Sequence, residues 1–142
     1  MTATRHPYIR PGFFMTYVAN PIMKRLGIVP TLTVRGRRSG KLLTVPLGEP
    51  LDLDGTRYLV SGRGNTHWVR NLRAAGRGEF RFHGLTQPFR AVEVEGAERE
   101  RIVAAYRARL GRSVNSYFAR IPDPAEHPVF RMEPIEGATT SG

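Results

Sequence analysis

The chain has 142 residues, which suits a single domain large enough to bury a self-supporting core. It has 22 Lys and Arg residues against 12 Asp and Glu, a formal net charge of +10, so nucleic acid, an anionic membrane or a polyanionic small molecule would be attracted to it. There is no cysteine, which excludes disulfide bonds, thiol catalysis and thiolate metal sites.

The N-terminal part predicts a flexible arm followed by an amphipathic helix. Residues 1–11 are polar and lack the apolar core of a signal peptide. Residues 13–26 place apolar side chains at helical spacing. The longest apolar stretch, residues 13–23, is interrupted by a proline and two polar residues, so it is too short and broken to span a bilayer. Because Lys24 and Arg25 adjoin the apolar face, this helix either packs on the body of the domain or makes peripheral contact with a membrane.

A basic hairpin follows. Residues 31–34 and 43–47 alternate between apolar and polar side chains, which predicts two half-buried strands. The connecting sequence GRRSGK, residues 36–41, has glycines that permit a tight reversal and crowds three cations and a hydroxyl onto the tip. These cations repel one another unless an anion or solvent offsets them, and guanidinium groups bind phosphate or carboxylate oxygens in bidentate fashion. The alternatives are an anion site and a solvated basic turn; the spacing excludes a nucleotide-binding P-loop.

The next stretch predicts a turn, a strand and a loop rich in backbone amides. Residues 52–55 read as a β-turn and residues 56–61 as a third strand. Residues 61–65, with the sequence SGRGN, precede a helix that Asn65 or Thr66 can cap. A glycine-rich loop before a capped helix offers free N–H groups to an anion, and an ordinary strand-to-helix connection is the alternative.

That helix begins near His67, carries Trp68 and Asn71 on one face, and ends at Gly76 and Gly78. The remaining elements are expected in this order: a hairpin with arms at residues 79–83 and 87–95, an amphipathic helix at 97–110, a short helix at 114–121, a last strand at 129–135 and a disordered tail at 137–142. Residues 12–136 then form one α+β domain, with about six mainly antiparallel strands that close into a small barrel and about three flanking helices.

The sequence contains few of the residue patterns that are typical of catalytic sites. The four histidines lie far apart, so no metal site is expected. The nucleophile-elbow pattern is absent around Ser39 and Ser61, and no pair of carboxylates is apparent. The basic residues are scattered without interleaved aromatic residues, which argues against a specific nucleic-acid partner. If the protein is an enzyme, a bound cofactor is expected to supply the chemistry.

Four short sequences together resemble the deazaflavin (F420)-dependent nitroreductase family, over residues 32–94. They are GRRSGK followed by VPL at residues 45–47, YLVS at residues 58–61, the glycine-rich loop, and W-x-x-N-L at residues 68–72. The resemblance implies a split β-barrel of the flavin-reductase type that binds coenzyme F420. The polyanionic tail of that coenzyme would suit the basic hairpin and the charge of +10.

The resemblance also implies roles for individual residues. The hairpin would hold the phosphate and the tail through Arg37, Arg38, Ser39 and Lys41, and the deazaflavin ring would be lined by Val45, Pro46 and Leu47. The glycine-rich loop would close around the ring with Ser61, Gly62, Arg63 and Gly64. That loop would be supported by Trp68 and Asn71. Ser61 and Tyr117 are the candidate catalytic proton donors, with Tyr17 or water as alternatives. Tyr106 falls on the apolar stripe of its helix, which faces the core.

Two positions depart from the family pattern. Leu43 stands where relatives usually have an arginine, and the loop before Trp68 is short, which changes how the ring is covered. The leading hypothesis is a cytoplasmic F420-dependent reductase, a homodimer by family, that transfers a hydride to a small apolar enone, quinone or nitro compound. The alternatives are FMN as the cofactor, a carrier of F420 or FMN with little catalysis, and a membrane- or nucleic-acid-binding module attracted by charge.

Overall fold

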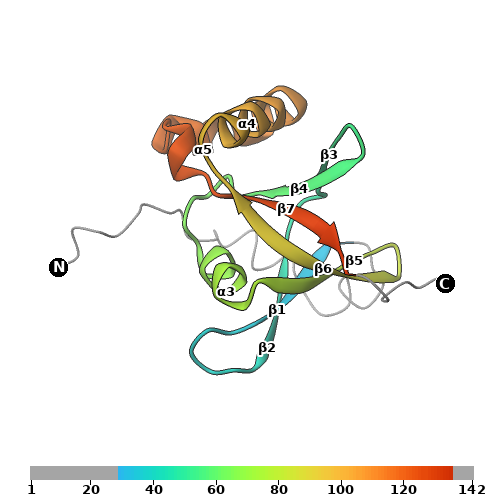
Figure 1. The fold of residues 1–142 in the computed structure, drawn as a ribbon. Helices are drawn as coiled ribbons and strands as arrows, with labels where there is room; N and C mark the ends of the chain where they lie inside the picture. Colours follow the sequence, from blue (N-terminus) through green and yellow to red (C-terminus); the bar gives the residue numbers. More distant parts are fainter. Residues whose placement is uncertain (1–28, 136–142) are drawn as a thin grey trace.

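The computed structural model describes residues 29–135 and shows an α+β fold in which helices pack on a strongly bent antiparallel sheet (Figure 1). The predicted arm at residues 1–11, the helix at 13–26 and the tail at 137–142 lie outside the described residues. The strands are β1 (Thr31–Arg35), β2 (Leu42–Pro46), β3 (Leu51–Leu53), β4 (Thr56–Val60), β5 (Arg77–Phe82), β6 (Leu85–Val94) and β7 (Val129–Pro134). The helices are α3 (His67–Ala75), α4 (Gly96–Leu110) and α5 (Arg112–Arg120), followed by a 3-10 turn, η2 (Pro124–Glu126).

The described strands form one seven-stranded sheet in the order β2-β1-β5-β6-β7-β4-β3, and each neighbouring pair is antiparallel. The prediction of about six strands missed β3, because residues 52–55 were interpreted as a turn. Leu51 is buried and pairs with Tyr58, and the reversal is confined to Asp54 and Gly55, which both have positive φ.

The predicted closure into a barrel is not borne out for residues 29–135. Strands β2 and β3 lie at the two edges of an open sheet, and no ladder joins them. The connection between them, residues 47–50, contains Pro50 and follows Pro46, and neither proline has an N–H to donate to a ladder. The chain therefore passes between the two edges without pairing as a strand.

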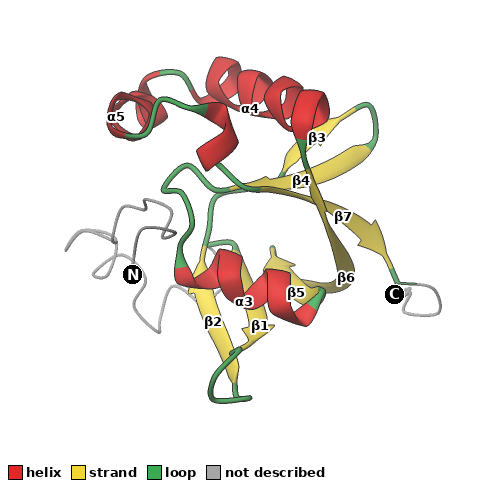
Figure 2. Ribbon diagram, turned by 60° about the vertical axis from the view of Figure 1, so that its left-hand side comes forward, coloured by secondary structure: helices red, strands yellow, loops and turns green. Residues whose placement is uncertain are grey.

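Two hydrophobic cores share the central strands. In the first, Trp68, Val69 and Leu72 of α3 pack against β1, β5 and β7. In the second, α4 and α5 pack against β3, β4 and β7. Because successive side chains of a strand point to opposite faces, Tyr58 of β4 joins the second core and Leu59 the first. Figure 2 shows α3 on one side of these strands and α4 with α5 on the other.

Helix α3 is bounded largely as predicted. Gly76 is its C-cap in the left-handed conformation, with φ of 75°, and its N–H donates to the Leu72 carbonyl. Thr66 stands at the N-cap position, but its side chain makes no capping hydrogen bond, and Gly78 lies within β5 rather than at the helix end. None of the helices within residues 29–135 has the length and hydropathy needed to cross a membrane.

Candidate functional site

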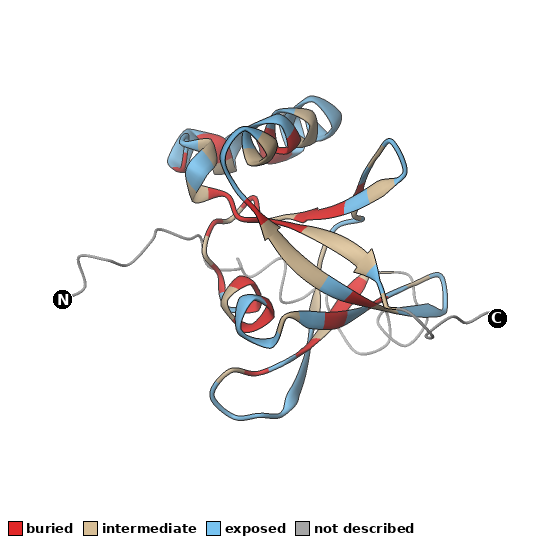
Figure 3. Cartoon of the chain, in the orientation of Figure 1, coloured by how far each residue is buried: buried red, intermediate tan, exposed pale blue. Residues whose placement is uncertain are grey.

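The basic hairpin between β1 and β2 is a tight, exposed loop. The Gly36 N–H donates to the Lys41 carbonyl at 2.8 Å, and the Gly40 N–H donates to the Gly36 carbonyl at 3.0 Å. The Ser39 hydroxyl accepts from the Lys41 N–H at 3.1 Å, so this side chain shapes the turn. Arg38 and Lys41 are exposed, and Figure 3 shows the tip of the hairpin in the colour of exposed residues.

Arg37 is held by helix α3. Asn71 is buried, and its side-chain oxygen accepts from the Arg37 backbone N–H at 3.0 Å and from Arg37 Nη1 at 2.7 Å. Arg37 Nη2 lies 3.4 Å from His67 Nδ1. The resemblance assigned Asn71 to the glycine-rich loop, but the structure places it against the hairpin, where it fixes the backbone and the guanidinium of Arg37 together.

The positive charge on this side of the molecule is denser than the sequence motif indicates. The pKa of Arg37 is lowered, first by partial burial and then by the charges of Arg70 and Arg38. Arg70 comes from α3, so no spacing along the hairpin could have identified it. Residues 36–41 contain no acidic side chain. Such a cluster is stabilised by phosphate or carboxylate groups, which is the chemistry of a phosphate-linked polyglutamate tail.

The glycine-rich loop, residues 61–65, is built differently. Ser61 is buried; its N–H donates to the Pro128 carbonyl at 3.0 Å, and its hydroxyl donates to the Gly64 carbonyl at 2.5 Å. The single hydroxyl hydrogen of Ser61 is therefore engaged within the loop. This geometry supports Ser61 as a residue that positions the loop more than as a proton donor.

Gly62 brings this loop against α4 and α5. A Cβ atom at this position would lie 2.9 Å from the Tyr106 hydroxyl oxygen and 2.9 Å from Cδ2 of Tyr117. Burial, with a smaller contribution from Tyr117, raises the pKa of Tyr106 to about 12, while Arg63 acts in the opposite direction. Arg63 also has a buried Nη1 atom without a hydrogen-bond partner. A protonated phenol and an unpaired guanidinium nitrogen thus lie beside the loop.

An apolar cleft of about 400 Å³ opens next to these residues. Its lining comes from the connection between β2 and β3, from the start of β3, from β4 and from the C-terminal half of α4: Leu47, Gly48, Glu49, Pro50, Leu51, Leu59, Val60, Tyr106, Arg109 and Leu110. Of the residues predicted to contact the ring, Leu47 lines the cleft, while Val45 and Pro46 are half-buried beside it. Tyr106 belongs to the lining and Tyr117 does not. Tyr106 also packs against the second core, as its place on an apolar stripe predicted.

The cleft and the basic hairpin lie at the two ends of β2. At roughly 3.3 Å per residue of extended chain, Lys41 and Leu47 are separated by about 20 Å. An elongated ligand with an anionic tail and an apolar ring system fits such an arrangement. Trp68 is buried in the first core, with its ring 6.3 Å from that of Phe130, so its contribution is structural. Residues 29–135 contain no cluster of His, Asp or Glu side chains that could hold a metal ion.

Comparisons with known proteins show the family and the fold of the chain. The model of a family described as F420H(2)-dependent quinone reductase matches residues 14–121. A solved structure described as an F420-H2 dependent reductase, FDR-A, is 25% identical with a TM-score of 0.51, and the match covers 74% of this chain and 93% of that chain. No curated protein matches the chain.

Two further solved structures resemble the fold alone. One, described as a domain-swapped dimer, is 22% identical with a TM-score of 0.53, and the match covers 83% of this chain and 98% of that chain. The other, a protein of unknown function from Agrobacterium tumefaciens, is 19% identical with a TM-score of 0.57, over 90% of this chain and 58% of that chain.

Proposed function

The chain belongs to the F420H(2)-dependent quinone reductase family, and from this premise we propose that it reduces a small, largely apolar quinone by hydride transfer. The family establishes that the protein is a reductase and that its cofactor is coenzyme F420. Membership of this family argues against three alternatives: a carrier with little catalysis, an FMN protein, and a membrane- or nucleic-acid-binding module. Enones and activated nitro compounds are the other acceptors that we would test.

The observation that supports this function most is the pairing of a basic cluster with an apolar cleft across β2. Arg37, Arg38, Lys41 and Arg70 would hold the anionic tail of the coenzyme. Asn71 orients Arg37 for this task and lowers the entropic cost of ordering a long side chain on binding. The bound coenzyme supplies the hydride, while the chain supplies binding, orientation and an environment that excludes water.

We assign the proton-donor role to Tyr106 rather than to Ser61 or Tyr117. When a quinone accepts a hydride, one carbonyl oxygen gains negative charge and must be protonated. The Tyr106 phenol lines the cleft and, with a pKa of about 12, keeps its proton at neutral pH. Its proton passes to the quinone oxygen, and the phenolate regains a proton from water. Arg63 lowers the energy of the negative charge during this transfer.

A binding experiment tests the coenzyme site. The purified protein is titrated by fluorescence with F420, with the same deazaflavin riboside lacking the phosphate and tail, and with FMN, each at two salt concentrations. We expect F420 to bind most tightly and to lose affinity as salt rises, because the cluster contributes through charge. Equal affinity for F420 and the tail-less riboside would contradict the assignment of the hairpin.

A single-turnover experiment tests the reaction. Reduced F420 bound to the protein is mixed with a naphthoquinone, an enone or a nitroaromatic compound, and oxidation of the coenzyme is followed by absorbance. We expect the quinone to react fastest. Tight F420 binding with no oxidation by any acceptor would contradict the proposed reaction while leaving the coenzyme site intact.

We further infer that the protein forms a homodimer. Two observations support this: β2 has a free edge among the described strands, and a structural neighbour is described as a domain-swapped dimer. Light scattering on the purified protein tests it, and a monomer at micromolar concentration would contradict it.

A further inference from the structure

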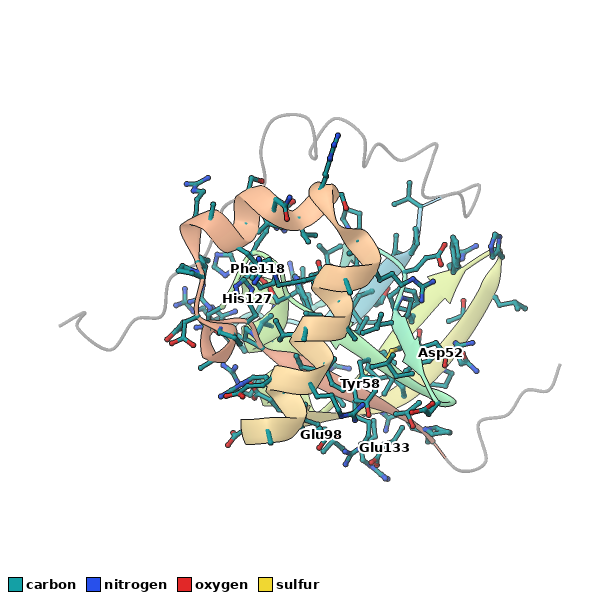
Figure 4. The ribbon with its side chains drawn as sticks, turned by 90° about the horizontal axis from the view of Figure 1, so that it is seen from above. Asp52, Tyr58, Glu98, Phe118, His127 and Glu133 are labelled. Atoms are coloured by element: carbon teal, nitrogen blue, oxygen red, sulfur yellow. The ribbon has the colours of Figure 1, made fainter. Side chains whose placement is uncertain are left out.

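We infer that His127, held as a doubly protonated imidazolium, is a positioning residue that ties the glycine-rich loop to helix α5. The imidazole is fully buried. Its Nδ1 lies 3.0 Å from the Ser61 carbonyl oxygen, and its Nε2 lies 2.6 Å from the Ile121 carbonyl oxygen. Figure 4 shows His127 beside Phe118.

The two partners determine the number of protons on the ring. A carbonyl oxygen can only accept a hydrogen bond, and a neutral imidazole has one N–H group and one nitrogen lone pair. A neutral His127 would therefore point a lone pair at one of the two carbonyl oxygens. Only the imidazolium form donates at both nitrogens, so the geometry assigns a positive charge to this buried side chain.

The surroundings show what opposes and what supports that charge. Burial opposes it. The Phe118 ring is stacked on the imidazole, with 4.1 Å between the two ring centroids. It stabilises the positive charge because the face of an aromatic ring attracts cations. Arg107 of α4 lies over the same phenyl ring, 4.4 Å from its centroid, and its charge disfavours a second cation.

The elements that contact His127 also carry titratable and charged residues. These are Tyr117 and Arg120 on α5, Arg63 in the loop, and Asp123 and Glu126 at the start and end of η2. The Asp123 carboxylate accepts from the Ala125 N–H at 2.9 Å. The hydrogen-bond partners of the imidazole are thus two backbone carbonyls, so its protonation is coupled directly to the backbone of the loop and of the α5 terminus.

The consequence concerns the coenzyme. Ser61 is fixed on both sides of its peptide unit: its N–H donates to the Pro128 carbonyl, and its carbonyl accepts from His127. Ile121 ends α5, which also presses Tyr117 against Gly62. Loss of either hydrogen bond would loosen the loop or α5. Loop order and coenzyme affinity therefore depend on both hydrogen bonds of His127.

This inference rests on the proposed function only where it concerns coenzyme binding, so the first test uses the protein without coenzyme. Protein labelled with ¹⁵N at histidine is studied by NMR at neutral pH. We expect both ring nitrogens of His127 to carry slowly exchanging hydrogens, because both face carbonyl oxygens. A single protonated nitrogen would overturn the inference. His83, exposed in the turn between β5 and β6, provides an internal reference.

The second test separates His127 from the coenzyme site. F420 affinity is measured for the natural protein, for His127→Gln and for the control His83→Gln. We expect the natural protein and the control to bind about tenfold more tightly than His127→Gln, which cannot donate to both carbonyls and so loses one buried hydrogen bond.

Each outcome of the second test has a distinct meaning. Equal F420 affinity in His127→Gln and the natural protein would overturn the inference. If neither the natural protein nor the variants bind F420, the proposed function fails, while the NMR measurement still decides the protonation of His127. If His127→Gln does not fold, the NMR measurement on the natural protein still tests the inference, and a single protonated ring nitrogen would overturn it.

Discussion

Two glycine-rich loops meet the candidate site, and the protein builds them in opposite ways. The loop at residues 36–41 is exposed and basic, and one buried side chain, that of Asn71, anchors it. The loop at residues 61–65 is largely buried, and a segment far along the chain anchors it at Ser61 through the Pro128 carbonyl and the His127 imidazole. The first presents charge to a ligand, whereas the second fixes the position of backbone and aromatic rings.

The contrast explains what each loop tolerates. Exposed charges interact with a ligand through solvent, so each contributes modestly and their effects depend on salt. Buried contacts allow little adjustment because protein interiors are close-packed. We therefore expect substitutions in the buried loop to affect both folding and binding, and substitutions in the exposed loop to affect binding alone.

Gly62→Val should produce the largest effect. The new side chain would meet Tyr106 and Tyr117, each 2.9 Å from the position of a Cβ atom. Overpacking of this kind costs about 3 kcal/mol of the free energy of unfolding. We expect a matching decrease in denaturant midpoint and loss of F420 binding.

The control for this prediction is Gly48→Ala, and only its denaturant midpoint is compared with that of Gly62→Val. Gly48 has no atom within 4 Å of its Cβ position, so the added methyl group meets nothing. An equal loss of stability in both variants would mean that the contact between the loop and the two tyrosines is not what destabilises Gly62→Val.

The same contrast shows what could be predicted from sequence. The hairpin is local: its turn bonds join residues within six positions, and alternation of apolar residues identified both of its strands. Most strands and all three described helices were predicted for the same reason. Strand β3 was missed because three residues are too few to show a period, and barrel closure was wrong because the pairing of sheet edges leaves no local pattern.

The site was predicted where its parts are contiguous. Arg37, Arg38 and Lys41 share one motif, whereas Arg70 reaches the same cluster only because α3 packs against β1. His127 lies 66 residues from Ser61 along the chain. No spacing rule spans that distance, so contacts that bring distant segments together required the structure.

The Tyr106 phenol gives the next largest effect, on the pH dependence of stability. Its folded pKa is about 12 against an unfolded value of 10.0. Because the folded pKa is the higher one, the stabilisation is fully present below pH 10 and is lost as pH rises through 12. A difference of two pKa units between the folded and unfolded states corresponds to a loss of about 2 to 3 kcal/mol in the free energy of unfolding at most.

The measurement is the free energy of unfolding of the natural protein and of Tyr106→Phe at pH values from 9 to 12. We expect the natural protein to lose more stability over that range than the variant, since phenylalanine has no proton to lose. Parallel curves would show that the tyrosine titrates normally, and would weaken its assignment as a donor that stays protonated.

Asn71→Leu should have a smaller effect, about 1 to 2 kcal/mol, because leucine fills a similar volume but accepts no hydrogen bond. The Arg37 backbone N–H and guanidinium would both lose a partner. We expect weaker F420 binding together with modest destabilisation, measured by fluorescence titration and denaturant unfolding. Asn115→Leu, at an exposed position of α5, is the matched control. Equal effects in the two variants would contradict the anchoring role of Asn71.

Arg38→Ala should have the smallest effect, confined to coenzyme affinity. Arg38 is exposed at the hairpin tip, so its removal leaves the core unchanged. We expect a loss of about three- to tenfold in F420 affinity at low salt, a smaller loss at high salt, and little change in turnover at saturating coenzyme. Arg81→Ala removes an equally exposed charge from the end of β5 paired with Thr31, away from the hairpin. If both variants weaken binding equally, the coenzyme senses the net charge of the protein; if only Arg38→Ala does, it senses the hairpin.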